Sequence, residues 1–440
     1  MKLTIGKLND TWNYTVNLNN KNYYLRGVID GETVEANIQK NGLSILKIIN
    51  ASSNRDKVKC PYQEVCGGCQ GLHMKYEYQL ALKEQMVERL FKDNKLIPSN
   101  FKVSHIISGI DNHYRNKSQI VFGYNSRKVV SGFYEELSHK IVNVNDCLMQ
   151  DELITDAQKK IVDLIMKFHY TIYDEATNKG LIKHVLIKST NLSEVMIVIV
   201  TNEDVLPGSN NFVKAIISQM KNVKSIIQNI NNKKTTHVLG DKSKVLFGKD
   251  YISDELLGFK FIISSKSFYQ INKYTTPLLY KEIVNLVKNK SYASALDAYS
   301  GTSTIGIIVS PYVKKVTCVE LEKEAVNNAK ENVKVNKTNN VRVFQGDATQ
   351  FINNMERSHE SVDLVLMDPP RSGSTQEFMK ALKKLKPKEI IYISCDPHTQ
   401  VEDLKILIND YTISKIQPVD MFPNTFHVET VVLLTRKNSK

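Results

Sequence analysis

The amino-acid sequence predicts an α/β protein. Residues 256–440 should form a doubly wound αβα sandwich, after a small β-barrel at residues 1–58 and a mixed central domain at 59–255. From about residue 256 onward, short apolar runs alternate with helical patterns, as in folds with a parallel sheet. A turn of small residues at 299–306 follows the first of these runs and opens a helix. The first part of the chain instead carries only short strand-like pieces separated by turn signals.

The predicted strands of the C-terminal part are short and rich in Val, Ile, Leu and Ala. They lie at residues 293–298, 316–319, 341–344, 362–367, 390–394, 413–416 and 427–434. A helix is predicted at 323–334, between the second and third strands. Because strands and helices alternate, we expect a mainly parallel sheet whose strands end at one common edge.

Four successive strands end at or just before an acidic residue. These residues are Asp297, Glu320, Asp347 and Asp368. In an αβα sandwich, such strand ends lie side by side in the crevice that binds ligands. Glu320 follows the small-residue turn at about the spacing of an acid that binds a ribose hydroxyl. The turn is not G-x-G-x-x-G and has no P-loop lysine, so it provides poorly for a nucleotide phosphate. S-adenosylmethionine, which carries adenosine without a phosphate, fits better.

A single thiol, Cys395, follows the apolar run 390–394, and Pro397 comes just after it. The run predicts a buried strand that delivers Cys395 to the ligand-binding edge. Free cysteines are often only small buried hydrophobes, and Cys318 on an earlier strand fits that interpretation. Cys395 follows four strands that end in acids, and this position favours a catalytic nucleophile over a packing residue.

The N-terminal part contains several short strand-like pieces. They lie at residues 14–18, 23–28, 35–38 and 43–49. So many short strands in so few residues predict an OB-like barrel, a scaffold that often binds single-stranded nucleic acid. The stretch 27–34 resembles the turn of the TRAM module found in RNA-modifying enzymes. A structural barrel without a ligand is the alternative.

Three cysteines follow the barrel, spaced C-x5-C-x2-C at Cys60, Cys66 and Cys69, and Cys147 is the only other cysteine in this half of the chain. Thiols this close together, with two glycines at 67–68 that permit a tight wrap, are hard to explain as core packing. Four cysteines suit a 4Fe–4S cluster or a zinc ion. Structural zinc usually uses two short Cys pairs, and only one pair here is short, so the spacing favours iron–sulfur.

Two segments of the central region, 112–119 and 131–139, combine aromatic side chains with cations or hydrogen-bonding residues. This composition suits stacking on splayed bases and contacts with phosphates, but a solvated strand face has the same composition. Residues 76–91 form the clearest helix of this part, with apolar residues every three or four positions and Lys83 among the charged residues between them. We interpret it as a packing helix.

The chain carries 59 Lys and Arg residues against 46 Asp and Glu, a net charge of +13. This excess suits a polyanionic partner, nucleic acid above all. No apolar stretch reaches the length of about 18 residues typical of a transmembrane helix. The N-terminus lacks the pattern of a secretory signal. We therefore expect a cytoplasmic monomer without membrane contact, in a compartment that keeps cysteines reduced.

Five motifs of the C-terminal part belong together: SFYQIN at 267–272, DAYSG at 297–301, DPPR at 368–371, SCDP at 394–397 and HVET at 427–430. With them, residues 266–440 resemble the catalytic domain of the RNA 5-methyluridine (uracil-C5) methyltransferases. The four cysteines Cys60, Cys66, Cys69 and Cys147 are similar to the iron–sulfur ligands of the 23S rRNA branch, so the resemblance covers nearly the whole chain. One departure is Ser300, where relatives often carry Cys.

The resemblance implies a Rossmann-like class I S-adenosylmethionine-dependent methyltransferase domain that methylates uracil C5 in RNA, with 23S rRNA as the first choice of substrate. A tRNA (uracil-5-)-methyltransferase is the alternative. A more remote alternative is an RNA-binding iron–sulfur protein whose methyltransferase domain is inactive; the presence of both Cys395 and Glu429 argues against it.

The resemblance also implies a role for each site residue. Cys395 would add to C6 of uracil, and Glu429 would remove the C5 proton. The cofactor and base pocket would be lined by Gln270, Tyr299, Glu320, Asp347 and Asp368. Glu320 would take the ribose, and Asp368 would contact either the cofactor or the uracil edge. Because C5 is out of reach inside a helix, the target base should be flipped or lie in a loop.

Overall fold

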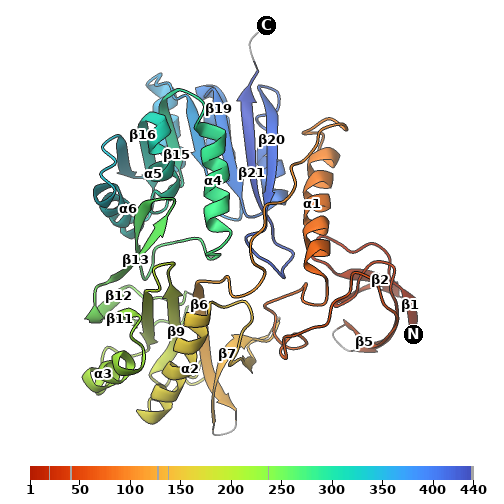
Figure 1. The fold of residues 1–440 in the computed structure, drawn as a ribbon, viewed down its shortest axis with the longest axis vertical. Coiled ribbons are helices and arrows are strands. Elements are labelled where there is room, and N and C mark those ends of the chain that lie inside the picture. Colours follow the sequence, from red (N-terminus) through yellow and green to blue (C-terminus); the bar gives the residue numbers. More distant parts are fainter. Residues whose placement is uncertain (19, 40–41, 126–127, 137, 236, 438–440) are drawn as a thin grey trace.

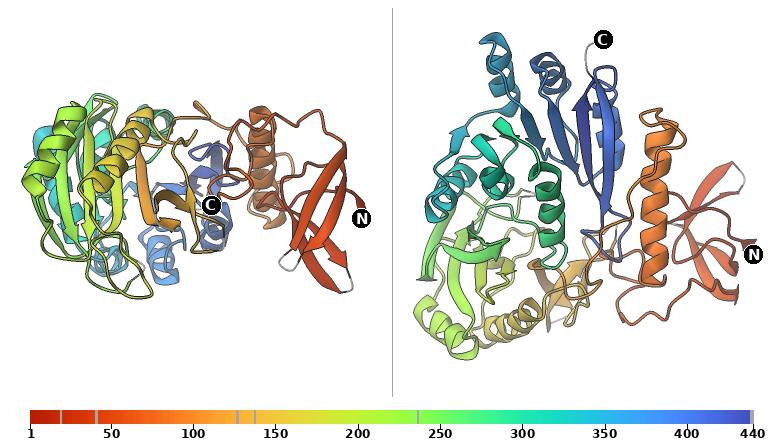
Figure 2. Two further views of the ribbon diagram at one scale, coloured as in Figure 1. Left: turned by 90° about the horizontal axis from the view of Figure 1, so that it is seen from below. Right: turned by 45° about the horizontal axis from the view of Figure 1, so that its top comes forward.

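The computed structural model describes residues 1–18, 20–39, 42–125, 128–136, 138–235 and 237–437. Three groups of strands follow one another along the chain (Figure 1): a small N-terminal group, a central sheet, and a C-terminal sheet flanked by helices. The long helix α1 (Tyr76–Asp93) stands between the N-terminal strands and the C-terminal sheet, as the right-hand view of Figure 2 shows. Among the helices in these ranges, none has the length and apolar character needed to cross a membrane.

The N-terminal strands form two small sheets over one apolar core. They are β1 (Lys2–Thr4), β4 (Thr33–Gln39) and β5 (Gly42–Asn50) in one antiparallel sheet, and β2 (Tyr14–Leu18) and β3 (Lys21–Leu25) in a hairpin. Trp12 and Val28 are buried in the core. The four predicted strand positions are confirmed, but β3 ends before residue 28 because Gly27 turns the chain with a φ of +70°.

Helix α1 is buried on two sides. Its residues Val87 and Phe91 pack into the C-terminal core, whereas Leu82 contacts the N-terminal core. The packing helix predicted from the sequence is therefore confirmed. Lys83, which the sequence places among the charged positions, is fully buried, because its ammonium group pairs with Asp420 near the other end of the chain.

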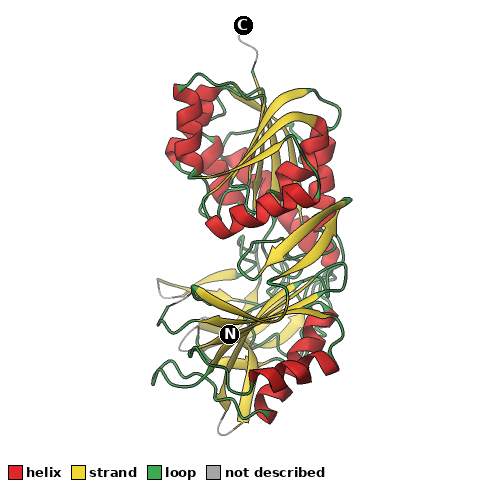
Figure 3. Cartoon of the chain, turned by 90° about the vertical axis from the view of Figure 1, so that its left-hand side faces the viewer, coloured by secondary structure: helices red, strands yellow, loops and turns green. Residues whose placement is uncertain are grey.

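The central region is a seven-stranded sheet with two helices packed against it. In Figure 3 strands and helices pack together in this lower part of the molecule. In spatial order its strands are β12 (Lys242–Gly248), β11 (Val223–Ile230), β10 (Val195–Thr201), β9 (Ile182–Ser189), β6 (Lys117–Asn125), β7 (Lys128–Tyr134) and β8 (Ile141–Asn143). Ile161 of α2 (Glu152–Lys167) and Phe212 of α3 (Ser209–Gln219) pack in the core beneath the sheet. The segment 131–139 lies on β7 and just beyond it, and Leu137 is outside the described residues.

A hairpin joins the central sheet to the C-terminal part. It consists of β13 (Tyr251–Leu256) and β14 (Phe259–Ser264), and helix α4 (Thr276–Val287) follows it. Leu257 and Gly258 form its two-residue turn with φ values of +50° and +82°. Positive φ at both central residues is typical of the turns that match the twist of a hairpin.

The C-terminal sheet contains seven strands in the order β17, β16, β15, β18, β19, β21, β20. They are β15 (Tyr292–Ala298), β16 (Val313–Glu320), β17 (Val341–Gln345), β18 (Leu364–Met367), β19 (Glu389–Ser394), β20 (Tyr411–Val419) and β21 (Glu429–Arg436). The first five in this order are parallel, and β21 runs antiparallel to both neighbours. All seven predicted strands are confirmed. The last begins at Glu429 rather than His427, because the His427 N–H donates to Thr425 Oγ1 in a turn.

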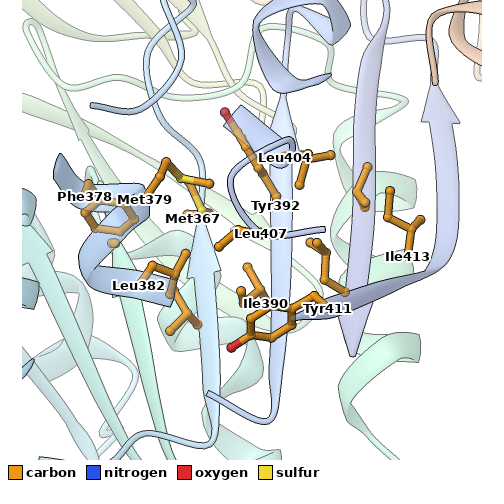
Figure 4. Packing of buried hydrophobic residues seen from close by; sticks show 14 of the residues in the cluster. Met367, Phe378, Met379, Leu382, Ile390, Tyr392, Leu404, Leu407, Tyr411 and Ile413 are labelled. Carbon is orange, nitrogen blue, oxygen red and sulfur yellow. The ribbon is translucent and has the colours of Figure 1, made fainter. Parts of the chain in front are cut away.

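Helices cover both faces of this sheet. One face packs against α4, α5 (Thr304–Val309) and the adjoining 3₁₀ helix (Ser310–Tyr312), and the other against α7 (Ala348–Arg357), α8 (Gln376–Leu385), α9 (Pro397–Leu404) and α1. The predicted helix at 323–334 is α6 (Lys323–Val335). Figure 4 shows the second face, where Leu404 lies beside Tyr392 of β19 and where Phe378 of α8 belongs to the same core. The predicted αβα arrangement is therefore present.

Candidate active site

The candidate active site lies at the edge of the C-terminal sheet where its parallel strands end. Strands β15, β16, β18 and β19 finish there. Strand β21 runs the opposite way, so its first residue, Glu429, lies at the same edge. Cys395 and Asp368 each follow directly after a strand of this group. The sheet topology therefore collects these three side chains, which are far apart in the sequence, at one place.

Cys395 and Glu429 are neighbours across two paired strands. Ser394, the last residue of β19, pairs with Thr430 of β21, which sets Cys395 level with Glu429. The Cys395 side chain is half-buried. Burial, followed by the negative charges of Glu429 and Asp368, raises the pKa of Cys395 to about 12. The resting thiol is therefore protonated at neutral pH and does not act as a preformed thiolate.

Glu429 and Asp368 form a pair of carboxyl groups that resist full ionisation. Glu429 is buried. Burial raises the pKa of Glu429, and the nearby Asp368 raises it further. Burial likewise raises the pKa of Asp368. Two such groups share protons, because ionising both would place like charges together away from water. Near neutral pH the pair can therefore accept or release a proton.

Several charged groups act on the Cys395 thiol. Of these, Arg371 is the one that favours the thiolate, because its charge is positive. Its Nε lies 3.6 Å from Asp396 Oδ2. Its Nη2 lies 3.3 Å from Nδ1 of His427. Burial and then the Arg371 charge lower the pKa of His427 to about 4, so this imidazole is neutral. Sequence reasoning assigned no role to Arg371 or His427, although both belong to the motifs DPPR and HVET.

The small-residue turn after β15 is held by Glu320. Glu320 Oε2 accepts a hydrogen bond of 2.9 Å from the Gly301 N–H, and its Oε1 accepts one of 2.8 Å from the Glu322 N–H. Gly301 has a φ of +55°, a conformation that glycine adopts without strain. An added Cβ at Gly301 would meet no atom within 4 Å, so the turn borders open space. The Ser300 hydroxyl is buried and has no hydrogen-bond partner within the described ranges.

Two more of the predicted cofactor residues border this turn. Tyr299 has a φ of +61°, and its hydroxyl lies 2.8 Å from Ser374 Oγ. Its ring packs against Phe378 at a centroid distance of 5.3 Å. Asp347 caps the N-terminus of α7, where its Oδ1 accepts a 2.9 Å hydrogen bond from the Gln350 N–H. An open turn with an unpartnered hydroxyl and nearby carboxylates fits a small polar ligand such as S-adenosylmethionine.

Gln270 reaches the site from the segment before α4. It is buried, and its side chain lies near the Tyr280 hydroxyl. The same hydroxyl is near Asp368 and Glu429, whose charges, after burial, raise the pKa of Tyr280. Asp297 behaves differently from the other strand-end acids. It is fully buried, and its Oδ2 accepts a 2.9 Å hydrogen bond from an amide inside α5, so it supports the turn from within the core.

The four predicted cluster cysteines come near one another. A bridge between Cys66 and Glu135 ties the cysteine loop to the central region. Burial raises the pKa of Cys69, and the thiols of Cys147, Cys66 and Cys60 raise it further. Among the described residues, no group of three or more Cys, His, Asp or Glu side chains is arranged to hold a metal ion. The cluster therefore stays a prediction that rests on the set of four thiols.

Comparisons with known proteins point to one family. The family model described as tRNA (Uracil-5-)-methyltransferase matches residues 75–437. A protein of Clostridium tetani (strain Massachusetts / E88), named as an uncharacterized RNA methyltransferase, is 38% identical over 445 residues, covering 99% of this chain and 94% of that protein. A protein of Staphylococcus aureus (strain MSSA476) with the same description is 38% identical over 404 residues, covering 90% of this chain and 89% of that protein.

A solved structure is similar along the whole chain. It is the tRNA (uracil-54, C5)-methyltransferase of Pyrococcus abyssi in complex with S-adenosyl-L-homocysteine, with a TM-score of 0.78 and 25% identity. The match covers 99% of this chain and 100% of that chain. Since the family model spans most of the sequence and the relatives match over about nine-tenths of their length, the chain belongs to the tRNA (uracil-5-)-methyltransferase family and is an enzyme of the RNA methyltransferase class.

Proposed function

We propose that this enzyme methylates uracil C5 in RNA, with S-adenosylmethionine as methyl donor and Cys395 as nucleophile. The observation that carries the proposal is the placement of Cys395 beside Glu429 at the ligand edge of the sheet. A thiol and a buried carboxyl group in this arrangement supply the nucleophile and the base that the reaction requires. Membership of the family supports the same reaction.

The chemistry explains why both groups are needed. Uracil C5 is a weak nucleophile. When Cys395 Sγ forms a bond to C6, the electron pair of the C5–C6 double bond moves into an enolate, and C5 becomes nucleophilic. Bound S-adenosylmethionine supplies an electrophilic methyl group on a sulfonium. Glu429 then takes the proton from C5, the double bond re-forms, and the C6–S bond breaks to release the Cys395 thiolate.

The charges around Cys395 suit a thiol that ionises only as it reacts. Its raised pKa keeps the resting group protonated, so the thiol proton passes to water at this half-buried position as the C6–S bond forms. Arg371 opposes the carboxyl groups and stabilises the developing thiolate. In this proposal Asp368 raises the pKa of Glu429, because the two groups share protons. The raised pKa makes Glu429 a stronger base for the proton on C5.

In the proposed cofactor site, Glu320 holds the ribose hydroxyls beside the open turn at Gly301. Tyr299 and Asp347 border the same space. Gln270 and Asp368, which both act on the Tyr280 hydroxyl, are proposed to line the same pocket. Asp368 contacts either the cofactor or the uracil edge. A carboxylate that accepts from two ribose hydroxyls is a common way to hold adenosine.

RNA binding is proposed for the parts that precede the catalytic sheet. Residues 1–58 act as an OB- or TRAM-like module, residues 59–255 as the cysteine-containing RNA-binding domain, and residues 256–440 as the methyltransferase domain. The proposed enzyme works as a monomer in the cytoplasm. The excess of positive charge, +13, supports a polyanionic substrate.

We also propose that Cys60, Cys66, Cys69 and Cys147 hold a 4Fe–4S cluster. Four thiols are the donor set that such clusters use. The cluster would tie the loop 60–69 to the central region. No step of methyl transfer passes through it.

For the substrate, we propose 23S rRNA, because the four-cysteine set is similar to that of the rRNA branch. A second candidate is tRNA, favoured by the full-length likeness to the Pyrococcus abyssi tRNA (uracil-54, C5)-methyltransferase. Methylation of isolated tRNA and of 23S rRNA fragments, measured in parallel with labelled cofactor, separates the two. Preferential labelling of tRNA would reverse our assignment.

RNA that carries 5-fluorouridine tests the mechanism, since C5 fluorine cannot leave as a proton. With the cofactor, the wild-type protein should form a covalent RNA adduct that survives denaturation. Cys395→Ser should abolish this adduct, and Cys318→Ala, which removes the buried thiol of β16, should retain it. If the wild-type protein forms no adduct with either RNA, the proposed mechanism is wrong.

A further inference from the structure

The loop 420–428 joins β20 to β21 and delivers Glu429 to the site. Val419, the last residue of β20, pairs with Glu429, the first residue of β21, so the two ends of the loop meet at the catalytic edge. Long connections usually run over the surface and vary in position. Here, residues 420, 421, 423 and 424 are all buried. The neighbours that hold this loop therefore act, together with the pairing of β21 in the sheet, on the position of Glu429.

Asn424, near the middle of the loop, is held through its backbone from two directions. Its carbonyl oxygen accepts hydrogen bonds of 2.9 Å from both the Gln70 and Gly71 N–H groups, which directly follow Cys69. Its own N–H donates to Gln79 Oε1 of α1 at 3.0 Å. Asn424 has a φ of +64°, a conformation that Asn tolerates better than most residues.

The Asn424 side chain adds contacts to other parts of the chain. Its Oδ1 accepts a 3.0 Å hydrogen bond from Gln79 Nε2. Its Nδ2 donates to the carbonyl oxygen of Asp111 at 2.8 Å and to Met149 Sδ at 3.5 Å. Met149 is two residues beyond Cys147. The buried residue Asn424 thus contacts the residues that follow Cys69, a residue close to Cys147, and helix α1.

The rest of the loop is fixed in the same way. Asp420 pairs with Lys83 of α1. The Tyr114 hydroxyl donates to the carbonyl oxygen of Pro423 at 3.0 Å, and Asn272 Nδ2 donates to that of Met421 at 3.1 Å. These contacts anchor the loop between its start and Asn424. Beyond Asn424 the chain continues directly through residues 425–428 to Glu429.

We propose that Asn424 is a positioning residue that sets the place of Glu429 by fixing the loop 420–428 to helix α1 and to the segments that carry Cys69 and Cys147. The proposal rests on the proposed function, in which Glu429 removes the C5 proton. Asn424 acts through the loop and does not touch the reacting atoms. It links the four-cysteine segment to the proton-abstraction step without any electron transfer.

Asn424→Gly is the informative variant, because glycine accepts the positive φ and keeps the backbone hydrogen bonds while the side-chain contacts are lost. With ordinary uridine RNA and cofactor, a poorly placed Glu429 leaves methylated uracil attached to Cys395. We expect a covalent adduct on a denaturing gel, as Glu429→Gln should also give. We expect kcat to fall by about tenfold or more, and KM for RNA to change by less than about threefold.

A second readout is independent of turnover. Amide hydrogen exchange of the segment 425–430 should accelerate in Asn424→Gly, because the loop has lost its central anchor. Asn340→Gly is the matched control. Asn340 Nδ2 donates two hydrogen bonds of 2.8 Å, to the carbonyl oxygens of Ser310 and Val313, at the opposite edge of the sheet. This control should lose stability without forming the adduct.

Asn424→Asp provides a further variant if the glycine variant fails to fold. It keeps the size of the side chain and the acceptor for Gln79 Nε2 but loses the two contacts made by Nδ2. Wild-type kinetics in the folded variant would overturn the proposal. Loss of activity without adduct accumulation would also overturn it, because another step would then be impaired. The 5-fluorouridine test separates this proposal from the proposed function. If the wild-type protein forms the covalent adduct with that RNA, the proposed function holds whatever the result for Asn424.

Discussion

The Lys83 ammonium group and the Asp420 carboxylate form an ion pair with an Nζ–Oδ1 distance of 2.6 Å, and both side chains are fully buried. The Tyr76 hydroxyl also donates to Asp420 Oδ2, at 2.8 Å. Removal of one partner leaves the other charge buried without compensation. We therefore expect Lys83→Met to reduce the free energy of unfolding by about 3–5 kcal/mol in denaturant titrations.

Lys92, on the same helix, provides the control for this prediction. It pairs with Glu88 one turn away, but both side chains are partly exposed. Lys92→Met should therefore cost less than about 1 kcal/mol. Equal losses of unfolding free energy in the two variants would show that the buried ion pair contributes no more to stability than the partly exposed one.

Arg371 should control the reactivity of Cys395. Since the Arg371 charge favours the thiolate, Arg371→Gln should raise the pKa of Cys395 further. At a fixed pH of about 9, alkylation of Cys395 by iodoacetamide should then slow by roughly threefold. Mass spectrometry of the Cys395 peptide measures the rate. Arg357→Gln, at the exposed end of α7, is the control. Unchanged alkylation in Arg371→Gln would contradict this role.

Asp297 should make the protein less stable as the pH rises. Burial raises the pKa of Asp297 to about 7 from an ordinary value of 3.8. Between about pH 4 and pH 7 the folded state holds this proton and the unfolded state has released it, so stability is highest below this window and falls across it. Across this window the raised pKa of Asp297 lowers the free energy of unfolding by about 4 kcal/mol. Asp297→Asn should remove this effect, so that the stability of the variant relative to wild type rises across this window.

Urea unfolding at several pH values measures this difference. Comparison with wild type cancels the contributions of Asp368 and Glu429, which titrate in both proteins. Asp241→Asn, at a fully exposed site, should leave the pH dependence almost unchanged. A parallel pH profile for Asp297→Asn and wild type would show that Asp297 is ionised in the folded state.

The sequence alone predicts much of the catalytic sheet. The apolar run 390–394 lies within β19 (Glu389–Ser394), and the run 293–298 lies within β15 (Tyr292–Ala298). These predictions succeed because a buried parallel strand leaves a continuous apolar signal of its own. Cys395 can be assigned to the ligand edge for the same reason, since it follows directly after such a strand.

The parts that fix the base could not be predicted in this way. Lys83 looks like a solvent-facing residue of an amphipathic helix, and its partner Asp420 is 337 residues away. Asn424 reads as an ordinary turn residue, but its contacts come from residues 70–71, 79, 111 and 149. Such contacts depend on how separate parts of the chain pack together. The local pattern of apolar and polar residues contains no information about that packing.

Metal analysis tests the four-cysteine proposal. Protein purified without oxygen should contain about four iron and four sulfide per chain. Cys69→Ser should lose most of the iron, whereas Cys395→Ser, which lies outside the cysteine set, should keep it. Iron removal by a chelator should lower the thermal midpoint, since the loop 60–69 loses its link to the central region. Zinc without iron would replace the iron–sulfur proposal.

Gly306 in α5 tests how closely the supporting turn is packed. A Cβ at this position would lie 2.4 Å from Cys318 Sγ and 3.0 Å from Asp297 Oδ2. Alanine normally stabilises a helix relative to glycine by about 1 kcal/mol. The clash lies in a fully buried site and should outweigh that gain, so we expect Gly306→Ala to cost about 1–3 kcal/mol in denaturant unfolding.

Cys318→Ala should relieve this clash, because it removes the sulfur atom that the new methyl group meets. The double variant Gly306→Ala/Cys318→Ala should therefore be more stable than the sum of the two single changes predicts, by about 1 kcal/mol or more. Gly346→Ala, whose added Cβ meets no atom within 4 Å, should change stability by less than about 0.5 kcal/mol. Strict additivity in the double variant would mean that Cys318 moves aside freely. In that case Asp297, which contacts both residues, would have to carry the whole penalty.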